Sequence, residues 1–219
     1  MPDPNASPSR GPSRNPSRVL VIAAHPDLRL SRVNQALMDA AARQPHVEVL
    51  DLYARYPDYV IDVAAEQARL ERVDLIVWQH PIHWYAMPPL MKLWLDEVFT
   101  MGWACGPGGD RLRGKHLWLV ASTGGTEAAY HPQGHNRYFF DAFLPPYEQT
   151  AALCGLRFLP PLVLHGAHQV SETELSAHVQ AFAQRLGSHP DWPELAEPSD
   201  CPRCEVPADQ RPPTEPRRP

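Results

Sequence analysis

Three segments of the sequence carry polar and aromatic residues of the kinds that bind ligands. The first, "HPDLRLSRVN" (25–34), contributes His25, Ser31 and Asn34. Ser31 has the position of an N-cap for an amphipathic segment at 31–44, and the free N–H groups of a helix N-terminus favour a bound phosphate. The same residues also suit a simple N-cap and a turn histidine, so this segment alone leaves both interpretations open.

The second segment, "HPIHWYAMPP" (80–89), places an aromatic pair between a buried apolar run at 73–78 and a helical pattern that follows two prolines. Held rigidly, Trp84 and Tyr85 can stack on a flat ring. The backbone of residues 82–85 can bond the polar edge of such a ring. Packing on a neighbouring helix or subunit is the alternative use of such side chains, and we expect it of Met87, Leu90 and Trp94.

The third segment, "STGGTEAAYHPQGH" (122–135), begins with Ser122, Thr123, Gly124 and Gly125. Glycine has no Cβ, so the backbone can approach a planar ligand closely, although a Gly-Gly pair after a strand is also a common turn. Together the three segments describe a site for a molecule with a phosphate at one end and a flat, polar-edged ring at the other. Flavin mononucleotide (FMN) fits this description.

The elements that must position these segments follow from the apolar pattern. Runs typical of buried strands occupy 18–24, 47–53, 74–78, 115–122 and 156–166. Helical patterns occupy 31–44, 64–73, 89–99, 139–155 (interrupted or begun late at Pro145-Pro146) and 171–186. This alternation predicts an α/β protein with the flavodoxin-like three-layer fold, a five-stranded parallel sheet in the order 2-1-3-4-5 with helices on both faces. Ligands then bind at the carboxyl ends of strands 1 and 3, where the first two segments lie.

Composition sets further bounds. The chain has 219 residues and a net charge of −5, which gives no electrostatic reason to expect nucleic acid as a partner. The sequence lacks an apolar span long enough for a membrane helix and the apolar core of a secretory signal, and its four cysteines are sparse, so we expect a cytoplasmic protein. Prolines are concentrated at both ends. We expect disordered tails at 1–17 and 188–219 around an FMN-binding domain at 18–187, with Cys201 and Cys204 in an inert tail and no metal site.

Four stretches carry a family resemblance: "AHPDLRLSRVN", "AAEQARLERVDLIVWQHP", "WQHPIHWYAMPPLMKLWLDEVF" and "GWACGPGGDRLRGKHLWLVASTGG". Over residues 18–186 the chain resembles the flavodoxin-like NAD(P)H:quinone oxidoreductases of the DT-diaphorase type. Within them it is most similar to the ancillary oxidoreductases of glutathione-gated bacterial potassium efflux systems.

The resemblance implies roles for individual residues. His25, Ser31 and Asn34 match the residues that bind the flavin phosphate and ribityl chain. Two further segments match those that contact the flavin ring: Ile82, His83, Trp84 and Tyr85 in one, and Ser122, Thr123, Gly124 and Gly125 in the other. Ser122 stands where Thr is common. Tyr130 matches a tyrosine that supports hydride transfer near the flavin N1/O2 region. A histidine of the family has no clean match, because His135 is one residue short of its spacing and His131 is further off.

The resemblance also implies an activity and partners. It indicates two-electron, ping-pong hydride transfer from NADH or NADPH to a quinone by an FMN-bound homodimer. It further implies docking on the cytoplasmic domain of a potassium efflux transporter, peripheral to the inner face of the cell membrane. A regulatory module with little turnover and an azo or nitro reductase are the alternatives. For Trp103, Tyr138 and Phe139, an interface and core packing both stay open.

Overall fold

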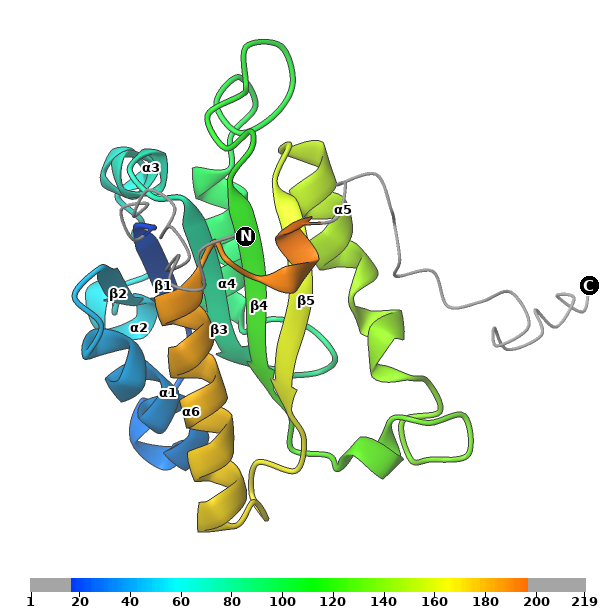
Figure 1. The fold of residues 1–219 in the computed structure, drawn as a ribbon. Helices are drawn as coiled ribbons and strands as arrows, with labels where there is room; N and C mark the ends of the chain where they lie inside the picture. The colour runs from blue at the N-terminus through cyan, green and yellow to red at the C-terminus, as the bar shows by residue number, and fades with distance from the viewer. Residues whose placement is uncertain (1–16, 197–219) are drawn as a thin grey trace, which may run out of the picture.

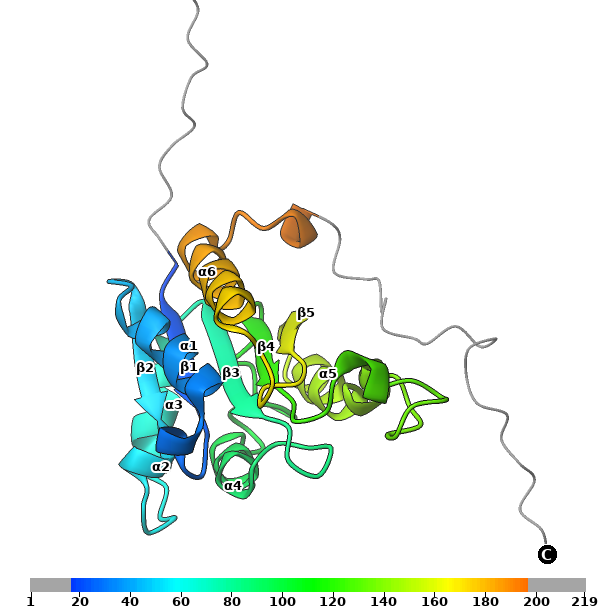
Figure 2. The ribbon, with the colours of Figure 1, turned by 90° about the horizontal axis from the view of Figure 1, so that it is seen from below.

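The computed structural model describes residues 17–196, which form a three-layer α/β fold (Figures 1 and 2). Five parallel strands pair in the order β2-β1-β3-β4-β5. The strands are β1 (Val19–Ala23), β2 (Val47–Asp51), β3 (Leu75–Pro81), β4 (His116–Ser122) and β5 (Arg157–Leu164). The predicted fold class and strand order are therefore confirmed.

Helices cover both faces of the sheet. One face packs against α1 (Arg32–Ala42) and α6 (Glu172–Ser188), and the other against α3 (Val63–Glu71), α4 (Pro89–Val98) and α5 (Pro145–Leu153). Short 3-10 turns occupy Leu28–Leu30, Glu127–Ala129, Phe140–Phe143 and Pro193–Ala196. Within the predicted segment at 139–155, a 3-10 turn at Phe140–Phe143 is followed by a break and by α5 from Pro145, so both the interruption and the late start of the α-helix are seen. The predicted capping box opens α6, where Ser171 and Glu174 bond each other reciprocally.

Strand β2 ends two residues before the predicted limit at Tyr53. The Asp51 side chain accepts hydrogen bonds from the N–H groups of Tyr53 and Ala54 and starts the short helix α2 (Leu52–Arg55). A capping carboxylate turns the chain into a helix here, although the apolar pattern of the sequence continues.

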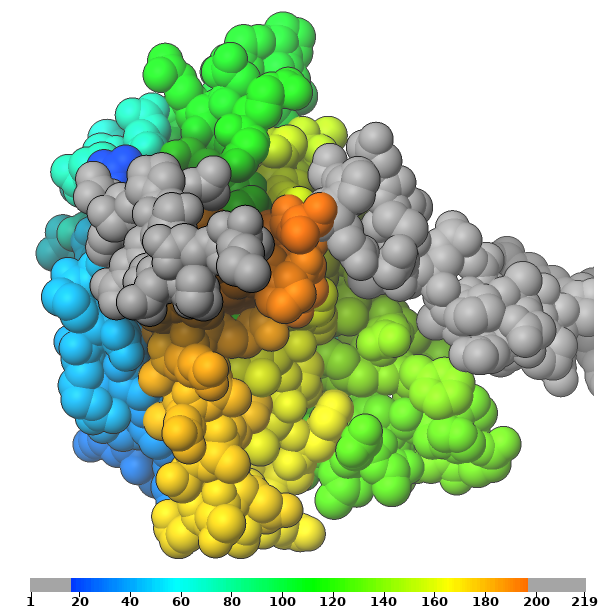
Figure 3. Space-filling view, viewed as in Figure 1, coloured from blue at the N-terminus to red at the C-terminus, as the bar shows by residue number. Residues whose placement is uncertain are grey.

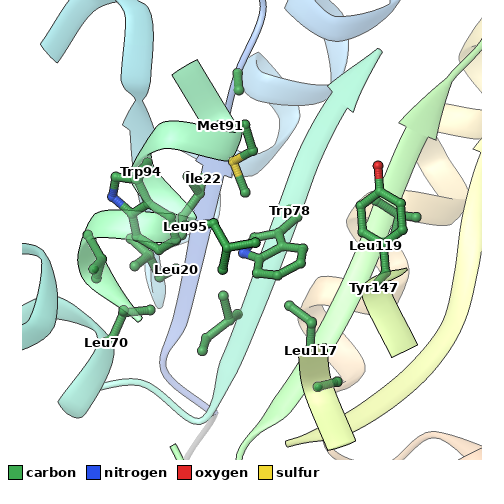
Figure 4. Close-up of a cluster of buried hydrophobic side chains, with 14 of the residues drawn as sticks. Leu20, Ile22, Leu70, Trp78, Met91, Trp94, Leu95, Leu117, Leu119 and Tyr147 are labelled. Atoms are coloured by element: carbon green, nitrogen blue, oxygen red, sulfur yellow. The ribbon is translucent and has the colours of Figure 1, made fainter. Parts of the chain in front are cut away.

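Alternate residues of each strand point into two separate hydrophobic cores. Trp78 and Trp94 are fully buried in the core beneath α3, α4 and α5, which Figure 4 shows in close-up. Leu90 is also fully buried there, while Met87 packs on the same core from the loop. These three residues (Met87, Leu90 and Trp94) thus pack against the protein interior, as the sequence predicts.

One carboxylate is completely buried at the edge of this core. Glu66 accepts hydrogen bonds from Tyr56 Oη at 2.6 Å, from Arg69 Nη1 at 2.8 Å and from Trp94 Nε1 at 3.2 Å. A buried charge is tolerated only when it is paired and hydrogen-bonded in this way. This network joins α3 and α4 behind the sheet.

Packing continues past residue 187, where the sequence placed the end of the domain. Trp192 is only 3% exposed, and its Nε1 donates to the Arg185 carbonyl at 2.9 Å. Its ring lies 4.9 Å from that of Trp118 on β4. The predicted tail boundary at 188 is therefore too early. The predicted disorder of the remaining tails, and Cys201 and Cys204, lie outside the described residues.

No helix in the described part of the chain is long and apolar enough to cross a membrane.

The space-filling view shows the loop after β4 (green) and the start of α6 (yellow) at the lower edge of the molecule (Figure 3). The loops at this edge follow the carboxyl ends of the strands (Figure 1).

Candidate functional site

The loops after β1, β3, β4 and β5 enclose two adjoining cavities at the carboxyl edge of the sheet. Their volumes are about 430 and 270 Å³, and they share Ile82 and Gly124. The larger cavity is lined by His25, Leu30, Ser31, Arg32, Val33, Asn34, Pro81, Ile82, His83, Ser122, Thr123, Gly124, Ala167 and His168. The smaller is lined by Ile82, Trp84, Tyr85, Gly124, Gly125, Ala129, Tyr130, His135 and Asn136.

The structure brings every predicted site residue to one or both of these cavities. Residues that the sequence reasoning missed come mainly from two places. Ala167 and His168 lie after β5, and the same strand-end argument that found the other loops applies to them. Asn136 lies one residue beyond the segment considered after β4.

The segments after β1 and β4 are tied together by one buried side chain. Asn34 is 2% exposed, and its Nδ2 donates to Ser31 Oγ and to Ser122 Oγ, both at 2.9 Å. Ser31 caps α1 and also accepts from the Asn34 N–H at 3.2 Å. Gln79 on β3 donates to the Asn34 carbonyl at 2.9 Å. The first and third predicted segments thus form one polar unit at the start of α1.

The larger cavity fits an anion with a polar chain attached. The first turn of α1 lines it, and a helix N-terminus directs unpaired N–H groups and a positive dipole end at such a ligand. Asn34 Oδ1 is buried without a hydrogen-bond partner among the described residues, which leaves an acceptor for a hydroxyl-bearing ligand. The Arg32 guanidinium is already bound within the protein, because it donates hydrogen bonds to Glu172 Oε1 at 2.8 Å and to the Val170 carbonyl.

Two histidines face each other across the larger cavity. The rings of His25 and His83 have centroids 6.2 Å apart in an edge-to-face arrangement. Burial, followed by the nearby His83, lowers the pKa of His25 below its ordinary value. His25 Nδ1 accepts from the Asp27 N–H at 3.2 Å, so the neutral ring carries its proton on Nε2. That N–H is a further donor for an anionic ligand.

The aromatic pair occupies a tight two-residue turn. His83 and Ala86 exchange backbone hydrogen bonds at 2.9 and 3.1 Å, and the two residues between them have positive φ, 49° at Trp84 and 66° at Tyr85. Such a turn normally has the sequence Asn-Gly, because each bulky residue in this backbone region adds about 1–3 kcal/mol of conformational strain. Strained backbone of this kind is concentrated at functional sites.

The two aromatic rings of this turn have different surroundings. Tyr85 stacks on Phe143 with ring centroids 5.1 Å apart, and its hydroxyl donates to Asn136 Oδ1 at 3.3 Å. The Trp84 side chain is 95% exposed at the rim of the smaller cavity. Only Tyr85 is therefore held by packing, and backbone geometry alone directs Trp84.

The glycine pair after β4 clears space in both cavities. A Cβ on Gly124 would meet the His168 ring at 3.5 Å, and one on Gly125 would meet Asn136 Nδ2 and Tyr130 at 3.4 Å. These are contacts that a side chain could tolerate, and neither glycine has a positive φ. The protein itself therefore does not require glycine at either position, and the close approach of a flat ligand stays a prediction.

Tyr130 forms an inner wall of the smaller cavity and is 8% exposed. Burial raises the pKa of its phenol, while a hydrogen bond with Thr123 acts in the opposite direction, so the group keeps its proton at neutral pH. Of the two histidines considered as its helpers, His135 lines the smaller cavity and His131 lines neither. A third histidine, His165, packs on Tyr130 with ring centroids 5.2 Å apart.

The chain belongs to the family described as having a flavodoxin-like fold, whose model matches residues 17–186. Among solved structures, it is 38% identical to the general stress protein 14 of Treponema denticola in complex with FMN (TM-score 0.74), with 77% of this chain and 97% of that chain covered. It is 27% identical to the NADPH-quinone reductase from P. pentosaceus (TM-score 0.71), with the same two coverages.

A further solved chain, named a thermophilic tryptophan halogenase from Streptomycin violaceusniger, is 40% identical (TM-score 0.73), with 75% of this chain and 96% of that chain covered. The names of these three proteins differ, and each of them matches this chain over nearly its own whole length.

Proposed function

We propose that this chain is an FMN-dependent NAD(P)H:quinone oxidoreductase that works by two-electron, ping-pong hydride transfer. The observation that carries the proposal is the pairing of two environments. A polar cavity at the start of α1 adjoins, at Ile82 and Gly124, a cavity walled by Tyr85 and Tyr130. A phosphate and a flat ring on one molecule match these neighbouring environments.

Two similar proteins support the choice of cofactor and reaction. The 38% identical protein of Treponema denticola was solved with FMN, and the 27% identical protein from P. pentosaceus is named an NADPH-quinone reductase. In the proposal the first turn of α1 binds the phosphate, with hydrogen bonds from His25 Nε2 and Ser31. Residues 82–85 and 122–125 contact the ring. FMN, when bound, supplies the hydride chemistry, and the protein supplies position and electrostatics.

Tyr130 is the catalytic residue of the proposal. A buried, protonated phenol can donate a hydrogen bond to negative charge that develops in a closed site. Its neighbours hold it in place, because Phe140 and Phe143 pack edge-on against its ring at centroid distances of 5.4 and 6.0 Å. The donor therefore needs little reorganisation during the reaction.

Steady-state oxidation of NADPH and NADH by the FMN-loaded protein tests the proposal, with a small quinone as acceptor. Tyr130→Phe is expected to lower kcat by about 10², the typical loss on removing one such donor. Tyr59→Phe, at an exposed tyrosine outside both cavities, is the matched control and should retain full turnover. An azo dye and a nitroarene in the same assay distinguish the acceptor classes. Negligible turnover with any acceptor while FMN stays bound would instead indicate a regulatory module.

We also propose, from the sequence resemblance, that the protein is a homodimeric ancillary subunit of a glutathione-regulated potassium efflux system. It would dock on the transporter's cytoplasmic domain, peripheral to the membrane. The exposed apolar side chains of Met101 (80%) and Leu153 (64%) are available to a partner surface. Light scattering of the purified chain tests the dimer, and co-purification with the transporter domain tests the docking. A monomer that does not bind that domain would contradict this part of the proposal.

A further inference from the structure

The loop after β4 turns back on itself and brings Asn136 to the smaller cavity. Gly134 lies so close to the preceding 3-10 turn that a Cβ there would be 2.5 Å from the Ala128 carbonyl oxygen and 2.6 Å from that of Ala129, so only glycine fits. The Asn136 N–H then donates to the Ala129 carbonyl at 2.9 Å. The backbone at residue 136 is therefore fixed beside the start of the same loop.

One hydrogen bond decides which way the Asn136 amide faces. Its Oδ1 accepts from Tyr85 Oη at 3.3 Å, so its Nδ2 lies on the other side of the amide. Nδ2 is 3.4 Å from the place that a Cβ on Gly125 would occupy, and the edge of the Tyr130 ring is equally close to that place. Nδ2 has no hydrogen-bond partner among the described residues, and Asn136 lines the smaller cavity. The amide thus offers the cavity two N–H groups in a fixed orientation.

The other polar groups near this wall are differently placed. Thr123 Oγ1 lies 3.0 Å from His165 Nδ1, and neither side chain lines the smaller cavity. His135 does line it, but no contact among the described residues fixes its ring. In the part of the chain that the structure describes, Asn136 therefore joins the Tyr130 phenol as an oriented donor of this cavity.

A quinone has the acceptor atom that such a donor needs. Negative charge grows on its carbonyl oxygen as electrons arrive, and a preorganised N–H directed at that oxygen stabilises the transition state more than the ground state. An azo compound has nitrogen rather than a carbonyl oxygen at its reducible bond and gains less from the same N–H. Because an amide does not titrate, the N–H holds the oxygen without giving up its proton.

We infer that Asn136 Nδ2 donates a hydrogen bond to the carbonyl oxygen of the electron acceptor and so favours quinones over azo compounds, an inference that rests on the proposed function. Tyr85 is a positioning residue, because its hydroxyl acts by orienting the amide. The Tyr85 ring is itself held by stacking on Phe143 at a centroid distance of 5.1 Å. The segment after β3 therefore sets the direction of a donor that belongs to the loop after β4.

Stopped-flow reoxidation of the FMN-loaded, NADPH-reduced protein tests the inference, with a benzoquinone and an azo dye as acceptors. Asn136→Ala should lower the ratio of the benzoquinone rate to the azo-dye rate at least about tenfold, less than the ~10²–10³ of a water-excluded oxyanion donor because this amide is half-buried. Asn136→Asp keeps an acceptor for Tyr85 but loses the donor, and should lower the ratio at least as far. Gln133→Ala, at an exposed amide of the same loop outside both cavities, is the matched control and should leave the ratio unchanged.

The orienting role of Tyr85 needs a separate measurement. Tyr85→Phe keeps the stacked ring and removes only the hydroxyl, so it should lower the same ratio about threefold, as expected for one neutral hydrogen bond. Added to Asn136→Ala, it should lower the ratio no further, whereas two independent structural roles would give additive losses. The loss in Asn136→Ala should be the same at acidic and alkaline pH, because the amide does not titrate. A donor role of His135 would instead vary with pH.

The outcomes separate the inference from the proposed function. An unchanged ratio in both Asn136 variants would overturn the inference and leave the proposed function in place. Equal slowing of reduction by NADPH and of reoxidation by benzoquinone would also overturn it, because the amide would then act on the flavin. Failure of NADPH to reduce the wild-type protein would overturn the proposed function and the inference with it. If Asn136→Ala does not fold, Asn136→Asp and Tyr85→Phe give the same decision.

Discussion

Replacing Trp84 by Asn tests whether the turn at 83–86 stores conformational strain. Trp84 has φ 49°, in a region that costs a bulky residue about 1–3 kcal/mol and that Asn adopts much more readily. The indole is 95% exposed, so its removal sacrifices little packing. We therefore expect Trp84→Asn to raise the free energy of unfolding by about 1 kcal/mol, the lower end of that range.

Urea denaturation of the FMN-free protein, followed by circular dichroism, measures this change at constant m-value. Trp84→Phe is the matched control, since it keeps both an aromatic ring and the backbone penalty, and its stability should stay within about 0.5 kcal/mol of wild type. Trp84→Asn should also raise KM for a quinone, because a wall of the smaller cavity is lost. A Trp84→Asn variant no more stable than Trp84→Phe would refute the idea of a strained turn.

Three further predictions concern buried polar groups. Glu66→Gln removes a fully buried carboxylate that accepts three hydrogen bonds, and it should lower the free energy of unfolding, measured by urea titration, by about 2–4 kcal/mol. The control Glu48→Gln changes an exposed ion pair and should lower it by less than about 1 kcal/mol. Equal losses would contradict the network. Asn34→Asp puts a negative charge beside the proposed phosphate site and should weaken FMN binding at least about tenfold by flavin fluorescence, an effect of about 1.4 kcal/mol. Gln35→Glu adds the same charge to α1 outside the cavity lining and should weaken binding less. Burial lowers the pKa of His80 from 6.5 to about 4, so the unfolded chain binds the proton more tightly. Its contribution to stability is therefore complete above pH 6.5 and falls by about 1.4 kcal/mol per pH unit down to pH 4. His80→Phe should reduce that slope in urea titrations, and an unchanged slope would argue against a buried neutral histidine.

The strand order follows from the sequence because five apolar runs alternate with five helical patterns, which favours the flavodoxin-like order. The limits of elements were less predictable where a single side chain decides them. The run at 47–53 stays apolar beyond residue 51, yet Asp51 accepts two backbone N–H groups and ends the strand. Trp192 stands alone among prolines and polar residues without periodicity, so its burial against Trp118 left no signal in the sequence.

The site was predictable wherever a loop directly follows a strand of the sheet. Ser31, Asn34 and Ser122 come from two such loops, and their hydrogen bonds to one another follow from the topology. The link between Thr123 and His165 could not be foreseen, because it depends on the register between β4 and β5. The left-handed backbone at the aromatic pair was equally hidden, since the residue types there usually avoid it.

The visible spectrum of the purified protein under anaerobic conditions tests the proposed function most directly. After incubation with FMN and removal of the excess, we predict bound flavin bands that bleach on addition of NADPH. The bands should return when a small quinone is added. A protein that stays colourless after incubation with FMN would contradict the assignment of both cavities. Flavin bands that neither NADPH nor NADH bleaches would contradict the oxidoreductase function while leaving the binding site in place.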